Sequence, residues 1–156
     1  GQVKADMSRI LSDGIGRGLN PRDIARNLTE QTGIEARRGH RIARTEVPMA
    51  LRRARWDEQD QAQEDYGTQA KLMHMSALSP TTRLTHARRH AKLFTSEETR
   101  EWYARDANAI NCKCSQVSVL VDEKGEPLVP AIVDRARKNY QVMKDKGNGP
   151  WADDKE

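Results

Sequence analysis

The sequence predicts an α+β fold, a mainly helical domain with a small antiparallel β-sheet. Apolar residues recur at helical spacing over most of the chain, whereas 115–121 begins with the apolar/polar alternation of a strand. Hydrophobic residues make up 36% of the 156 residues, enough for one domain with a modest core. We therefore expect a single domain over 1–145, followed by a flexible tail at 146–156 that is rich in glycine and charged residues.

The first 66 residues are predicted to be helical. Apolar side chains at positions 3, 7, 10, 11 and 15 indicate a helix over 3–15, which the glycines that follow would end. Asn20-Pro21 is typical of an N-cap with proline at the first helical position, and Gly33 would stop this second helix. A third helical stretch covers 34 to about 66, and Pro48 is expected to kink or split it because proline lacks a backbone donor.

The rest of the chain mixes strands and helices. The short apolar segment 71–77 is predicted to be a strand, and 81–94 a basic helix or helical turn. A helix should follow at 96–105, with acidic residues favourably placed in its first turn. The clearest strand is 115–121, which we expect to form a hairpin with a brief return strand at 128–129. The last predicted helix covers 130–144.

Positive charge is concentrated in two segments. Residues 34–55 hold seven arginines against two glutamates, a local net charge of +5, and 83–92 hold four cations and no acid. Such segments either bind a polyanion or form a solvated face paired with the five acids of 57–65. Because few aromatic residues interleave with the arginines, DNA binding here should be nonspecific and salt-sensitive. The candidate DNA-binding residues are Arg37, Arg38, Arg41, Arg52, Arg53, Arg55, Arg88 and Arg89.

Both cysteines lie one residue apart, at Cys112 and Cys114, and two histidines, His86 and His90, share a helical face at i and i+4. Two thiolates with these imidazoles offer the nitrogen and sulfur ligands of a structural zinc site. Two alternatives stay open. The cysteines could be small buried hydrophobic residues at a loop-to-strand junction, or they could form a strained disulfide across a very small ring. No other cofactor is expected, and so few cysteines fit a reducing cytoplasm.

Glu46 is the one acid within the apolar stripe of the long helix, where an unpaired charge would be costly. We expect it to form a structural ion pair with Arg83. The alternative is catalysis by Glu46, Arg83 and His86. No phosphate loop, dinucleotide fingerprint or nucleophile elbow is present, and no apolar run is long enough to span a membrane.

Three elements, in order, resemble a known family. Ile42-Ala43-Arg44-Thr45-Glu46 resembles the "IARTE" helix of the phage head morphogenesis family, the Mu F-like minor head proteins. Arg83-Leu84-Thr85-His86 resembles its Arg-x-x-His element, and Asn111-Cys112-Lys113-Cys114 resembles its Asn-Cys-Arg-Cys signature. The resemblance covers roughly residues 3–121, and the ordered combination is more specific than any one element.

This resemblance implies a non-enzymatic minor protein of the phage procapsid, located in the virion interior or the host cytoplasm. Its implied partners are the portal or the scaffold and capsid proteins, together with double-stranded DNA bound without sequence preference, and no membrane. The alternative is a phage-encoded effector or nuclease-like enzyme that uses the region of His86, Glu46 and Arg83.

Overall fold

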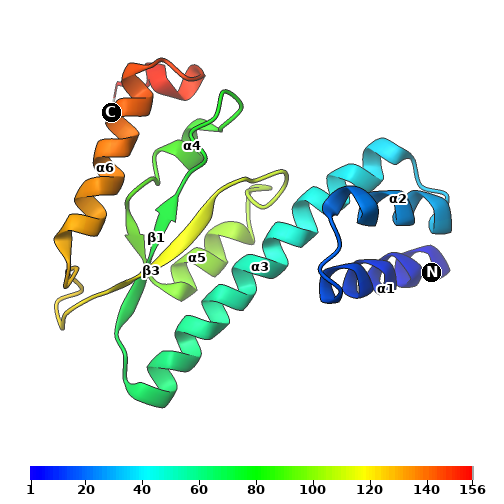
Figure 1. Ribbon diagram of the computed structural model, residues 1–156, viewed down its shortest axis with the longest axis horizontal. Helices are drawn as coiled ribbons and strands as arrows, with labels where there is room; N and C mark the ends of the chain where they lie inside the picture. Colours follow the sequence, from blue (N-terminus) through cyan, green and yellow to red (C-terminus); the bar gives the residue numbers. More distant parts are fainter. Residues whose placement is uncertain (156) are drawn as a thin grey trace. The chain divides into compact units, whose positions relative to one another are not determined.

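The computed structural model describes residues 1–155, which form six α-helices, a three-stranded antiparallel sheet and a short 3-10 helix (Figure 1). The predicted α+β class is confirmed. The chain forms two compact units, one of residues 1–54 and 106–112, the other of residues 55–105 and 113 onward. The expectation of one domain over 1–145 stays a prediction. No helix of the described residues is both long and apolar enough to cross a membrane.

The first unit is a small helical assembly of α1 (Gln2–Gly16), α2 (Pro21–Thr32) and the first part of α3 (Ala36–Tyr66). The side chain of Asn20 caps α2 by accepting from the Arg22 N–H at 2.9 Å, as the Asn-Pro pair predicts. Gly14 of α1 lies directly against Ile24, and a Cβ there would come within 2.7 Å of that side chain. Glycine therefore lets α1 and α2 pack closely. The core of this unit comprises Ile10, Ile24, Ala25, Leu28, Ile34 and Ala43.

Helix α3 continues through Pro48 as one element, so the helix is not split there. Its residues up to Ala54 belong to the first unit, and its residues from Arg55 belong to the second.

The second unit is built on a sheet in the order β2–β1–β3, formed by β1 (Ala70–Met75), β2 (Leu93–Phe94) and β3 (Ser115–Leu120). Helix α6 (Pro130–Asp145) covers one face, where Val133 and Ala136 pack with Met73 and Val119. Helix α5 (Ser96–Tyr103) lies on the opposite side of the sheet from α6 (Figure 1). Both faces of the central strand β1 are therefore covered, and Leu72, Met73 and His74 are all buried.

The segment 81–94 differs most from its prediction. Only α4 (Leu84–Ala87) is helical, and Leu93–Phe94 is a strand that the sequence analysis missed. The chain turns at Ala91, where φ is +65°, and the Ala91 N–H donates to the His74 carbonyl oxygen at 2.8 Å. A continuous helix is wrong here because β1 takes the backbone donors and acceptors that a helix would use.

The expected return strand at 128–129 is reduced to a bridge between Val121 and Pro127 and one bond from the Leu128 N–H to the Leu120 carbonyl, at 2.9 Å. Sheet pairing beyond β3 therefore ends after one or two residues, and β1 rather than this segment is the main partner of β3.

Part of the segment 146–156, for which a flexible tail is predicted, is packed against the second unit. Residues Pro150–Asp153 form the 3-10 helix η1, and the Trp151 side chain is buried against Leu78 and Ala87. Its indole N–H donates to the Ser79 carbonyl at 2.9 Å. The polar composition of this segment did not predict the contact. Burial of the single large Trp151 side chain is enough to pack a segment whose other residues are mostly polar. Residue 156 lies outside the described residues.

Candidate functional site

The loop before the cysteines has an unusual backbone. Asn111 adopts φ of +51°, a left-handed conformation that asparagine tolerates better than most residues. Its backbone N–H donates to the Thr45 hydroxyl at 3.2 Å, and the Arg52 guanidinium donates to the Cys112 carbonyl at 2.7 Å. Both partners lie on α3 within the first unit. These hydrogen bonds therefore fix the position of the backbone at Asn111 and Cys112.

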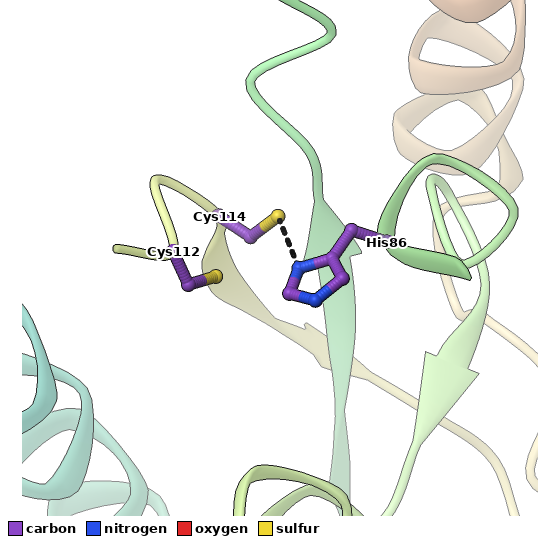
Figure 2. Close-up of side chains that lie close together, drawn as sticks. All are labelled: His86, Cys112 and Cys114. Atoms are coloured by element: carbon purple, nitrogen blue, oxygen red, sulfur yellow. Dashed lines mark hydrogen bonds between the residues drawn. The ribbon is translucent and has the colours of Figure 1, made fainter. Parts of the chain in front are cut away.

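In the second unit, α4 places the His86 ring next to Cys114, the residue immediately before β3. Nδ1 of His86 lies 3.7 Å from Sγ of Cys114, and both side chains are buried (Figure 2). Trp102 of α5 holds the imidazole from the side, with ring centroids 4.6 Å apart and planes at 63°. The ring orientation is therefore set by packing.

Cys112 is separated from Cys114 by Lys113 alone, so chain connectivity keeps the two thiols near one another. Neither cysteine is in a disulfide, and both are buried, with 3% and 5% of their surface exposed. One ligand atom from each of His86, Cys112 and Cys114 lies within 4.8 Å of the other two. Three of the four predicted metal ligands are thus found together (Figure 2).

Both ring nitrogens of His90, the fourth predicted ligand, contact other groups. Its Nδ1 accepts from the Ser76 N–H at 3.0 Å, and its Nε2 lies 3.1 Å from the carbonyl oxygen of Ala136. Burial lowers the pKa of this imidazole below 6.5, which favours a neutral ring with its proton on Nε2. The Ser76 N–H, just after β1, and the Ala136 carbonyl of α6 engage both nitrogens of His90, so the structure does not favour this residue as a metal ligand. Its place among the ligands stays a prediction.

The predicted DNA-binding arginines divide into exposed and internally engaged groups. Arg52 is only 5% exposed and donates to the Cys112 carbonyl, so it is a weak candidate for a DNA contact, and that assignment stays a prediction. Arg88 makes two hydrogen bonds of 2.9 Å with the carboxylate of Asp154. Arg89 stacks over Phe94 and Trp102, 3.7 and 4.1 Å from the ring centroids, and burial lowers its pKa. Arg88 is nevertheless exposed, as are Arg37, Arg38, Arg41, Arg53 and Arg55.

Arg55 is exposed, but its guanidinium also donates a hydrogen bond of 2.8 Å to the Gln116 carbonyl. This bond joins the second part of α3 to β3 within one unit. Arg55 is therefore a weaker candidate for DNA binding than the arginines at the start of α3.

Glu46 belongs to the first unit and Arg83 to the second. The ion pair expected between them stays a prediction, as does their alternative role in catalysis with His86. Since only 2% of the His86 surface is exposed, this imidazole offers no solvent-accessible general base.

A buried polar network in the second unit was missed by the sequence analysis. The Gln116 side chain accepts from the Trp56 indole N–H at 3.1 Å and donates to the Tyr103 hydroxyl at 3.0 Å. Gln116 is 1% exposed. The sequence predicted 115–121 as a strand, but its alternation gave no sign that Gln116 would be buried with two hydrogen-bond partners.

Comparison with protein families gives one match, to the family described as phage Mu protein F like protein, over residues 5–117. The matched region includes the Ile42–Glu46 segment, His86 and both cysteines. Comparisons with curated proteins and with solved structures give no significant match. Because the family match covers more than two thirds of the chain and carries the resemblance noted in the sequence, the chain belongs to the phage Mu protein F-like family of phage head morphogenesis proteins.

Proposed function

We propose that this protein acts in the phage procapsid as a minor head protein that associates with the portal and binds double-stranded DNA without sequence preference. Membership of the family supports the head role. The observation that carries the DNA-binding part is a row of exposed arginines on the first turns of α3, formed by Arg37, Arg41 and Arg44.

The spacing of these three residues places them on one side of the helix. At 3.6 residues per turn they fall within an arc of about 60°, and they span roughly 10 Å along the axis. Phosphates of one DNA strand recur about every 3.4 Å along the duplex axis, so the row matches a short run of phosphates. Glu46, the acid of α3 nearest to this row, lies on the opposite side of the helix.

The charge of this row is not compensated locally. No ion pair within the described residues involves any of its three arginines. By contrast, three other exposed arginines of the same unit each pair with an aspartate three or four residues before them, namely Arg9, Arg17 and Arg26 with Asp6, Asp13 and Asp23. The row on α3 is therefore the part of the first unit best suited to attract a polyanion.

The test compares two triple variants with the same change in charge. In the first, Arg37, Arg41 and Arg44 become Gln; in the matched control, Arg9, Arg17 and Arg26 become Gln. Affinity for labelled duplexes of two unrelated sequences is measured by fluorescence anisotropy across a salt series.

If each arginine of the row neutralises one phosphate, the first variant should reduce the slope of log K against log salt by about 2.7, from about 0.9 per contact. The control should change the slope little, and the two duplexes should bind equally. Equal losses in both variants, or an affinity of the natural protein that does not depend on salt, would refute the proposal.

The surroundings of His86 do not favour the alternative of a phage-encoded enzyme. Its central residue, His86, is buried against Trp102 and Cys114, and no described feature brings a reactive group to the surface beside it.

A further inference from the structure

The cluster of His86, Cys112 and Cys114 takes no part in the head or DNA-binding functions proposed above. We propose that Nδ1 of His86 and the two thiolates are the protein ligands of a zinc ion, and that the ion stabilises the loop-to-strand junction before β3. The proposal does not depend on the function proposed above.

The first support is distance. Zinc lies about 2.3 Å from a thiolate sulfur and about 2.0–2.1 Å from an imidazole nitrogen in tetrahedral sites. These lengths place a sulfur and a nitrogen of the same ion about 3.6 Å apart. The observed separation between Sγ of Cys114 and Nδ1 of His86 is 3.7 Å. The three ligand atoms together lie within 4.8 Å of one another, so small side-chain rotations would bring all of them to one ion.

The second support is preorganisation. Figure 2 shows both sulfurs turned toward the imidazole. Trp102 fixes the His86 ring, while Thr45 and Arg52 hold the backbone on either side of Cys112 through Asn111 and the Cys112 carbonyl. A site whose ligands are fixed by surrounding contacts binds metal without first ordering the chain.

The third support is charge. Two buried thiolates would be costly alone, but a dication neutralises them, and soft thiolates with an imidazole favour zinc over magnesium or calcium. Three protein ligands leave one tetrahedral position for a water molecule or another exchangeable donor.

The cysteine-x-cysteine spacing fits this arrangement. A disulfide between Cys112 and Cys114 would close a very small ring, and the structure has no disulfide between them. Ordinary burial would explain two small apolar side chains, but it would not require an imidazole nitrogen beside the sulfur.

The first experiment uses the natural protein, purified under reducing conditions, and asks whether it binds zinc. We expect about one zinc per chain by elemental mass spectrometry, and thiols that react slowly with a thiol reagent until a chelator is added. After exchange into cobalt, the absorption spectrum should show thiolate-to-cobalt charge-transfer bands. Because this spectrum needs no variant, a cobalt-loaded protein without those bands would overturn the proposal even if variants failed to fold.

The second experiment assigns the ligands. Replacing both cysteines by serine should weaken zinc affinity more than about 100-fold, since groups that merely support a ligand already contribute about 10–100-fold. His86→Asn should also weaken it, whereas the control His40→Gln, at a half-buried histidine of the first unit, should leave it unchanged. Zinc affinity that survives the double cysteine substitution would show that the metal binds elsewhere and would refute the site.

Discussion

The buried amide of Gln116 gives the sharpest prediction about stability. It joins three elements of the second unit, because Trp56 lies on α3, Tyr103 on α5 and Gln116 on β3. Gln116→Met keeps a side chain of similar shape but removes both hydrogen bonds. The Trp56 indole N–H and the Tyr103 hydroxyl then lose a partner in a buried environment.

The expected loss follows from these two groups. Each buried polar group left without a hydrogen bond costs about 1–3 kcal/mol, and the apolar methionine offsets part of the total. We therefore expect Gln116→Met to lower the free energy of unfolding of the second unit by about 2–4 kcal/mol. Ser118→Ala is the matched control, since Ser118 lies two residues further on the same face of β3 and bonds Gln59 at the surface. It should cost less than about 0.5 kcal/mol.

Urea denaturation followed by tryptophan fluorescence measures this loss. All three tryptophans, Trp56, Trp102 and Trp151, belong to the second unit, so the signal reports the unfolding of that unit. An unchanged dependence on urea concentration would show that the same transition is compared. If Gln116→Met costs no more than Ser118→Ala, the network does not contribute as argued.

Two further predictions concern the same unit. Trp151→Ala should lower the free energy of unfolding of the second unit by about 3–5 kcal/mol, because the indole is fully buried against Leu78 and Ala87. A urea midpoint equal to that of the natural protein would contradict the packing of Trp151. The pKa of His90 in the folded protein should lie below its ordinary value of 6.5, because burial disfavours the charged ring, so the unfolded state binds more protons as the pH falls through that value. The stability that it contributes is therefore present above pH 6.5 and lost as the pH falls toward the folded-state pKa, and an NMR titration in which His90 titrates at or above 6.5 would refute this.

Elements with a long hydrophobic period or a strong cap could be predicted from the sequence. Asn20-Pro21 marked the start of α2, and the apolar stripes of α3 and α6 marked these helices. The structure of segment 81–94 could not be predicted, because it depends on β1. The backbone of His74 in β1 forms hydrogen bonds with Ala91 and Lys92. Local propensity contains no information about such long-range pairing.

The candidate site shows the same limit. The pattern of residues brought His86, Cys112 and Cys114 to attention, and the structure places them together. It could not tell His86 from His90, which share a helical spacing, because the distinction arises from Ser76 and Ala136, partners distant in the sequence. Nor could charge counting separate Arg52, which bonds the Cys112 carbonyl, from the exposed arginines of α3.

The central claim, a head protein associated with the portal, is tested most directly by the composition of procapsids. Procapsids from a phage that encodes this chain would be purified with and without the portal protein, and the chain quantified in each by mass spectrometry. The account predicts a few copies per particle when the portal is present and none, or far fewer, when it is absent. A chain that is missing from portal-containing procapsids, or present at the same level without the portal, would contradict it.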